Sequence, residues 1–140
     1  MMKLKPFSSS FLALGGFFLV AMGVYFVFLR PALLPEDLRY IGSTLQTAKE
    51  NIPGLLNWLQ KVFWVMGGYI FTTGLLIIFI ALTSFRERLR GAFSIVALAG
   101  ISSIGSMTAV NFIIGSDFKW VLLTFTLPWI ISLTLYRLHK

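Results

Sequence analysis

VFWVMGGYIFTTGLLIIFIALTSF, residues 62–85, is an unbroken apolar stretch that contains no Asp, Glu, Lys or Arg. A helix of this length can cross the hydrocarbon core of a bilayer, which is roughly 30 Å thick. A helix on the surface of a soluble protein would need a polar face, and this stretch has none. It therefore predicts a transmembrane helix.

Three further stretches have the same character, at about residues 11–29, 92–114 and 120–136, and none of them contains a charged side chain. Each is long enough to span a bilayer, although the last is the shortest. The sequence therefore predicts an all-α fold. We expect a four-helix transmembrane bundle that forms a single integral membrane domain over residues 1–140.

The first stretch follows Lys3 and Lys5, as the apolar core of a secretory signal would. Ala21-Met22-Gly23 resembles a cleavage site, but the apolar run continues through Leu29. We therefore expect an uncleaved membrane helix.

Composition excludes several classes of function. The chain is 57% hydrophobic and 12% charged, whereas soluble domains carry about 25% charged residues. It has no cysteine and one histidine, His139, near its end, so the sequence predicts neither a metal site nor a cofactor. The net charge is +7, and the basic residues border the apolar stretches. This position points to membrane lipids as partners and argues against nucleic acid. The absence of ionisable groups from the four stretches argues against a proton relay.

The basic residues favour one orientation. Lys and Arg are concentrated in three short segments, the two chain ends and the turn at residues 86–90. Glu87 is the single acidic residue in these segments. The connections on the other side mix basic residues with acidic ones. Because Lys and Arg beside the spans favour the cytoplasmic side, we expect both termini in the cytoplasm.

The longest connection, at about residues 30–61, is amphipathic. Leu38, Ile41, Leu45 and Ala48 recur at helical spacing, which predicts one short interfacial helix between the first two spans. A bend is expected near Pro53, before the second span.

Glu36, Asp37 and Arg39 form a charged cluster at the start of that connection. They could act as an acid–base pair or bind a polar head group. The alternative is that the acids stabilise a helix N-terminus and the arginine pairs locally with one of them. Spacing alone does not reject this alternative, and we favour it.

Two residues in the spans are candidates for ligand binding. Asn111, near the outer end of the third span, could line a polar cavity or form a hydrogen bond between helices. Trp129 lies deep in the fourth span beside Pro128, where it could pack against protein or form the wall of a pocket for an apolar ligand.

Small residues recur in the second and third spans and predict close helix packing, either within one chain or between chains. The candidates for packing are Gly67, Gly68 and Gly74 in the second span and Ser102, Gly105, Ser106 and Ala109 in the third.

The stretches LPEDLRYIG at residues 34–42 and VFWVMGGY at 62–69 resemble small, uncharacterised bacterial membrane proteins with four predicted helices. This resemblance implies residence in the bacterial inner membrane and carries no activity.

Three hypotheses of function follow. The first is a non-catalytic accessory or self-assembling subunit, acting as a homo-oligomer or within a larger membrane complex. The second is a carrier or sensor that binds a lipid or apolar molecule between the helices. The third is an enzyme that acts on lipid head groups through Glu36, Asp37 and Arg39.

Overall fold

The computed structural model describes residues 5–138, and the regular elements of this part of the chain are all helices. The predicted all-α fold is confirmed, since four helices are long and apolar enough to cross a membrane. The first is α1 (Lys5–Val24) with its π-helical continuation η1 (Tyr25–Leu29), and the second is α4 (Leu55–Leu82). The third runs without a break through α5 (Ala92–Gly100), the π-helical turn η2 (Ile101–Gly105) and α6 (Ser106–Ile113), and the fourth is α7 (Lys119–Leu138).

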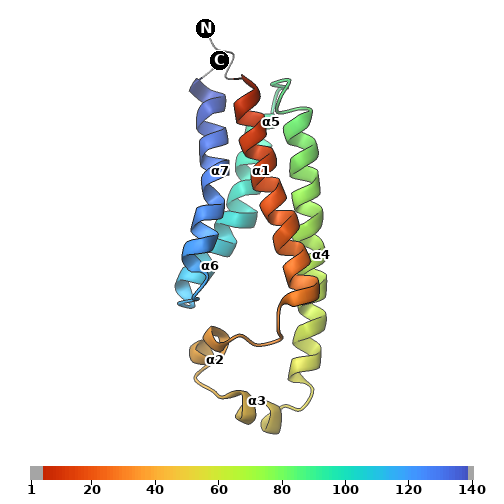
Figure 1. The fold of residues 1–140 in the computed structure, drawn as a ribbon, viewed down its shortest axis with the longest axis vertical. Helices are drawn as coiled ribbons and strands as arrows, with labels where there is room; N and C mark the ends of the chain where they lie inside the picture. The colour runs from red at the N-terminus through yellow and green to blue at the C-terminus, as the bar shows by residue number, and fades with distance from the viewer. Residues whose placement is uncertain (1–4, 139–140) are drawn as a thin grey trace.

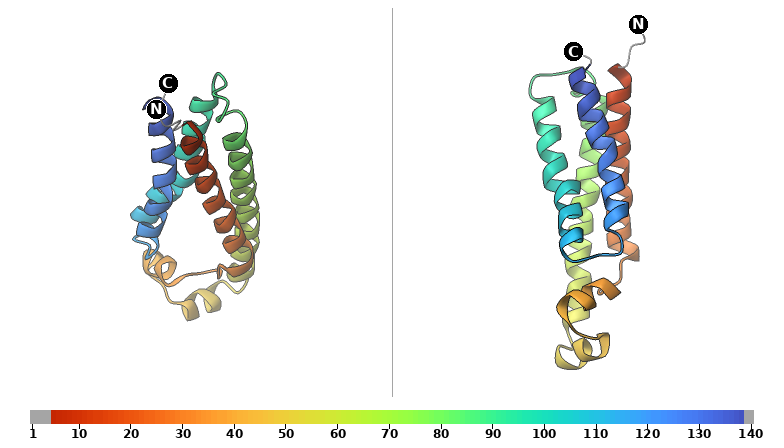
Figure 2. Two further views of the ribbon diagram at one scale, coloured as in Figure 1. Left: turned by 45° about the horizontal axis from the view of Figure 1, so that its top comes forward. Right: turned by 90° about the vertical axis from the view of Figure 1, so that its left-hand side faces the viewer.

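The helices form a wedge that is closed at one end. The start of α1 and the end of α7 lie beside the turn between α4 and α5, and the helices of the long connection lie at the opposite end (Figure 1). α1 packs on both α4 and α7. Towards the end formed by the long connection, α1 and α4 diverge from α6 and α7, as both Figure 1 and Figure 2 show.

Glycines bring α1 and α4 into backbone contact. A Cβ atom added to Gly74 would lie 2.6 Å from the backbone N of Val20 and 2.7 Å from the carbonyl O of Gly16. A Cβ atom on Gly67 would lie 2.9 Å from the carbonyl O of Gly23. Because lipid tails are as apolar as leucine, such close packing replaces the hydrophobic effect as the force that holds membrane helices together.

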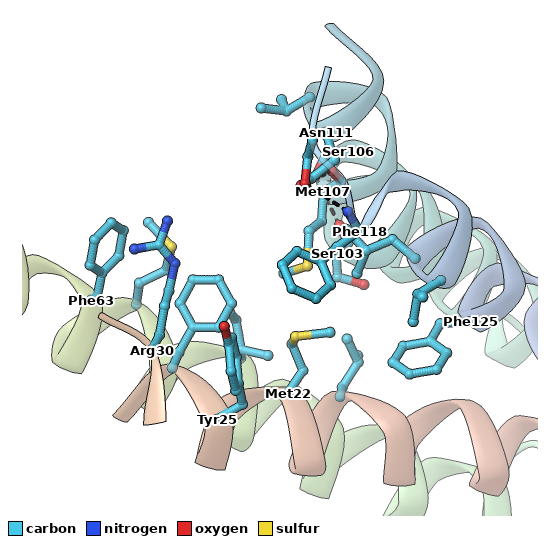
Figure 3. A pocket seen from close by; sticks show the side chains of 18 of the residues that line it. Met22, Tyr25, Arg30, Phe63, Ser103, Ser106, Met107, Asn111, Phe118 and Phe125 are labelled. Atoms are coloured by element: carbon cyan, nitrogen blue, oxygen red, sulfur yellow. Dashed lines mark hydrogen bonds between the residues drawn. The ribbon is translucent and has the colours of Figure 1, made fainter. Parts of the chain in front are cut away.

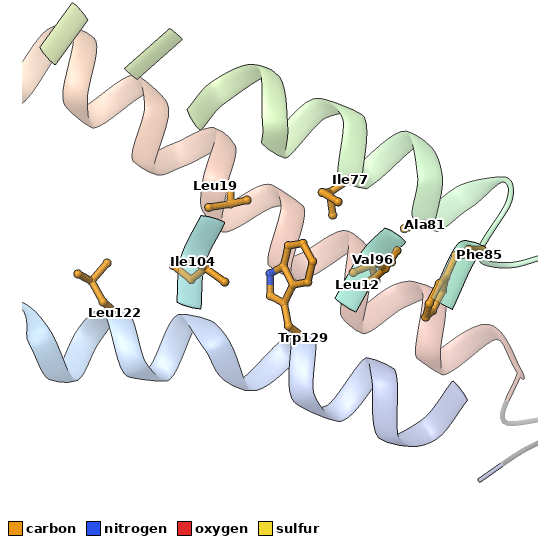
Figure 4. Packing of buried hydrophobic residues seen from close by; sticks show 10 residues of the cluster. Leu12, Leu19, Ile77, Ala81, Phe85, Val96, Ile104, Leu122 and Trp129 are labelled. Carbon is orange, nitrogen blue, oxygen red and sulfur yellow. The ribbon is translucent and has the colours of Figure 1, made fainter. Parts of the chain in front are cut away.

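Trp129 fills the space between α7, α1 and α5 in the narrow part of the wedge (Figure 4). A Cβ atom on Gly15 would lie 2.6 Å from its Nε1, and one on Gly100 would lie 2.7 Å from its Cε3. Close by on α7, the Ser132 hydroxyl donates a 2.7 Å hydrogen bond to the carbonyl O of Ser8. The core therefore joins α7 to α1 through one large side chain and one buried hydrogen bond.

The connection between the first two spans contains two short helices, whereas the sequence predicted one. α2 (Pro35–Ile41) ends at Gly42, which adopts a left-handed conformation with φ of 66°, and α3 is Leu45–Asn51. Thr44 caps α3, because its hydroxyl accepts a 3.1 Å hydrogen bond from the Thr47 N–H. The chain then turns at residues 52–54, next to the expected bend, and α4 begins at Leu55.

Candidate functional site

A cavity of about 790 Å³ occupies the wide part of the wedge (Figure 3). We call it the interhelical cavity. α1, η1 and α4 line one side and η2, α6 and α7 the other, while residues of α2 reach its end. Its walls are mainly apolar and include Met22, Phe26, Phe63, Met107, Leu122 and Phe125.

Both π-helical turns border the cavity. Tyr25 and Phe26 line it from η1, and Ser102 and Ser103 line it from η2. A π-helical turn inserts one extra residue into an α-helix, is rare, and occurs often at functional sites. Here the two turns lie in different spans and contribute to the same cavity.

The cavity is open to its surroundings between α4 and α6. Tyr69 of α4 is 74% exposed and Val110 of α6 is 52% exposed, although both line the cavity. α4 and α6 make no extensive contact with each other. Both residues lie within helices that are long and apolar enough to cross a membrane, so this opening lies between two candidate spans.

An arginine and an aspartate form an ion pair at the α2 end of the cavity. Nη2 of Arg30 lies 3.0 Å from Oδ2 of Asp37, which also accepts a 2.8 Å hydrogen bond from the Leu34 N–H. The guanidinium lies over the ring of Phe63, with Cζ 3.6 Å from the ring centroid. The side chain of Arg30 is only 9% exposed. Asp37 therefore fastens the start of α2 to the end of the first span.

Glu36 is the most deeply buried acid of the described residues that line the cavity, at 2% exposure. Its Oε1 accepts a 3.1 Å hydrogen bond from the hydroxyl of Ser116, in the turn between α6 and α7. The Ser116 oxygen in turn accepts a 3.1 Å hydrogen bond from the Phe118 N–H. Ser116 is thus oriented to donate towards the carboxylate, and the pair connects α2 to that turn.

Arg39 lies apart from the other two members of the charged cluster. It is exposed, does not line the cavity, and binds Asp117 at 2.8 Å. The hydrogen bond and charge of Asp117 raise the pKa of Arg39 above its ordinary value, and the charge of Glu36 adds a smaller effect in the same direction. Arg39 therefore makes a second, solvent-exposed link between α2 and the turn before α7.

The two candidates in the third and fourth spans lie in different surroundings. Asn111 lines the cavity, where its Nδ2 donates a 2.9 Å hydrogen bond to the carbonyl O of Met107 in the same helix. Trp129 belongs to the buried core, and the cavity lining does not include it.

The small residues also divide into groups. Gly67 and Gly74 face α1, whereas a Cβ atom on Gly68 would meet nothing within 4 Å. Ser102 and Ser106 line the cavity, and Ala109 is exposed. A Cβ atom on Gly105 would lie 3.0 Å from the carbonyl O of Gly100, in its own helix.

Arg30 and Ser116 belong to this site, and sequence reasoning missed both. Arg30 directly follows the first span, and Ser116 lies in the short Gly-Ser-Asp turn after the third. An arginine at a membrane boundary usually indicates topology. No local pattern connects Ser116 to an acid 80 positions away.

The described residues contain no group of three or more His, Cys, Asp or Glu side chains that could hold a metal ion. No family model, curated protein or solved structure matches the chain. Composition and geometry together identify an integral membrane protein with four spans.

Proposed function

We propose that this protein is a carrier or sensor that binds a lipid or other amphipathic molecule in the interhelical cavity. The observation that carries the proposal is a cavity of about 790 Å³ with apolar walls and charged residues at one end. Pockets for small molecules are typically about 300–1,000 Å³, mainly apolar, and contain a few polar groups that orient the ligand. An apolar chain would lie against the walls, with its polar head near α2.

The opening between α4 and α6 supports a membrane-dissolved ligand. A molecule that enters there, past Tyr69 and Val110, comes from the lipid phase and does not have to cross water. The connection at the end of the bundle is tied down by Glu36–Ser116 and Arg39–Asp117. Access through the end of the bundle is therefore more restricted than access from the side.

The geometry gives less support to a lipid head-group enzyme. Such an enzyme would need Glu36, Asp37 and Arg39 to face one cavity, but Arg39 is exposed and bound to Asp117. Asp37 is engaged by Arg30 and by the Leu34 N–H. This leaves Glu36 without a second catalytic group from that cluster.

A photoactivatable dodecanol probe, added to the protein in phosphatidylcholine nanodiscs, tests the proposal. Met107→Trp should fill part of the cavity and reduce specific labelling at least severalfold, since Met107 lines it. The matched control is Leu76→Trp, because Leu76 is 56% exposed on α4 and lies outside the lining. Equal labelling of both variants and the wild-type chain would contradict the proposal.

The proposed location is the bacterial inner membrane, with both termini in the cytoplasm. The ends of the described chain lie beside the α4–α5 turn, which carries Arg86, Arg88 and Arg90 (Figure 1). The opposite end mixes basic residues with Glu36, Asp37, Glu50 and Asp117. The positive-inside rule supports this orientation, and it would place the interhelical cavity nearer the outer side.

A second candidate function is assembly with further copies of the chain or with a larger complex. Gly68 and Ala109 are exposed on spans, and nothing within 4 Å would contact a Cβ atom on Gly68. Small exposed residues allow a neighbouring helix to approach. Light scattering of the protein in mild detergent tests this candidate, and a monomer that copurifies with no other protein would contradict it.

A further inference from the structure

The serine and threonine hydroxyls that line the interhelical cavity present acceptors to it, because their own hydrogens are already used. The hydroxyls of Ser102 and Ser106 donate to the carbonyl O atoms of Leu98 and Ser102, at 2.9 and 2.7 Å. Thr73 donates to the carbonyl O of Tyr69 at 2.8 Å. Each of these oxygens keeps an acceptor site.

Two further lining residues also donate within their own helix. Ser103 donates to the carbonyl O of Ala99, and the amide nitrogen of Asn111 donates to the carbonyl O of Met107. The amide oxygen of Asn111 is an acceptor, and its nitrogen keeps a second N–H. The lining also includes Tyr25, whose hydroxyl can donate or accept.

The one arginine of the cavity lining is already engaged. Nη1 of Arg30 donates to the carbonyl O of Pro31 at 2.9 Å and Nη2 to Asp37 at 3.0 Å, while its face lies over Phe63. Asp37 already supplies the negative charge that pairs with this guanidinium. Arg30 and Asp37 thus neutralise each other and fix the shape of the cavity.

Glu36 carries the charge that remains. Within residues 5–138 its carboxylate makes no ion pair, and its hydrogen-bond donor is the neutral Ser116 hydroxyl. Arg39 influences it through charge alone and is itself bound to Asp117. A buried carboxylate with one neutral donor is costly unless further donors or a cation approach it.

We infer that the interhelical cavity selects amphiphiles whose head group is a primary ammonium, with the head beside Glu36 and the apolar chain along Met22, Met107 and Phe125. This inference rests on the proposed function and adds the chemical class of the ligand. An ammonium group provides three donors and no acceptor, which matches a site rich in acceptors whose carboxylate, Glu36, is in no ion pair with the described residues. A carboxylate head would meet Glu36 with like charge, and an alcohol would provide one donor.

Three photoactivatable probes with the same dodecyl chain test the inference: an amine, an alcohol and a carboxylate. The full chain is placed in phosphatidylcholine nanodiscs, and labelling is measured against the mole fraction of probe in the bilayer, so that different partitioning cancels. The amine should half-saturate the site at a mole fraction about tenfold lower than the alcohol, because it adds a positive charge opposite Glu36 and three donors where the alcohol has one. The carboxylate should label least.

Glu36→Gln should abolish the preference for the amine and leave labelling by the alcohol in place. Glu50→Gln is the matched control, since Glu50 is an exposed acid on α3 outside the cavity lining. Equal half-saturation by amine and alcohol in the wild-type chain would overturn the inference, and so would an amine preference that survives Glu36→Gln. The comparison of probes on the wild-type chain remains decisive if Glu36→Gln does not fold.

The outcomes separate this inference from the proposed function. In one outcome, all three probes label the protein equally and Met107→Trp reduces this labelling. That result overturns the preference for an ammonium head group and supports an interhelical binding site. Labelling that Met107→Trp leaves unchanged overturns both.

Discussion

The hydroxyl of Ser116 donates a 3.1 Å hydrogen bond to the buried carboxylate of Glu36, 80 positions earlier in the chain. This contact joins α2, which follows the first span, to the turn that precedes the fourth. It lies where α1 and α4 have diverged from α6 and α7, so it connects the two sides of the wedge at the wide end of the cavity.

Ser116→Ala should lower the free energy of unfolding by about 1–3 kcal/mol, because it leaves a buried charged acceptor without its donor. Unfolding by sodium dodecyl sulfate in mixed micelles measures the change, and hydrogen exchange should show faster exchange in α2. Ser94→Ala is the control, since Ser94 is exposed on α5. A change no larger than that of the control would show that the contact does not hold α2.

Arg30→Ala should destabilise the protein far more than Arg39→Ala. Arg30 is nearly buried, and its removal leaves Asp37 unpaired at a cost of roughly 3 kcal/mol. The Arg39–Asp117 pair is exposed, and its loss should change stability little, because water and salt screen the two charges. Detergent unfolding of the two variants side by side measures the difference, and equal destabilisation would refute the structural role of Arg30.

Gly74→Ala should separate α1 from α4, since its Cβ would lie 2.6 Å from the backbone N of Val20. The expected loss of stability is about 1–3 kcal/mol, as for other overpacked cores. Gly68→Ala, in the same helix with open space around it, should be neutral or stabilise by up to about 1 kcal/mol. Thermal unfolding in detergent distinguishes the two, and similar melting temperatures would argue against the α1–α4 contact.

The natural absence of cysteine makes the orientation easy to test. With both termini cytoplasmic, a membrane-impermeant maleimide should label Glu50→Cys in intact cells and Glu87→Cys only after permeabilisation. Both positions are exposed, so accessibility of the side chain does not limit the reaction. The reverse pattern would show that the cavity end faces the cytoplasm.

The long helices could be predicted because lipid imposes a simple rule on them: a span that excludes charge for about 20 residues has little alternative to a helix. The break between α2 and α3 was missed for a different reason. The apolar spacing of Ile41 and Leu45 fits one continuous helix, yet Gly42 turns left-handed and Thr44 starts a new helix. The helix stop at Gly42 and the helix start at Thr44 therefore outweigh the apolar periodicity of this segment.

The cavity could be predicted only in part. Glu36 and Asp37 are candidates as members of a dense charged cluster, and Asn111 as a polar side chain in a membrane helix; all three line the cavity. Their partners Arg30 and Ser116 could not be assigned, since each pairing depends on how distant segments meet. Likewise, Gly67 and Gly68 are indistinguishable as sequence, and only the position of α1 separates a contact residue from an exposed one.

The packing of Trp129 between Gly15 and Gly100 has a consequence for the order of assembly. α1 and α4 leave the ribosome early and can pair through their glycines as soon as both are in the bilayer. Trp129 belongs to α7, and so does Ser132, which donates its hydrogen bond to Ser8, 124 positions earlier in the chain. Until the last helix is inserted, the flank of α1 at Gly15 faces lipid instead of the indole. Closure of the bundle therefore has to wait for α7, although the pairing of α1 with α4 does not.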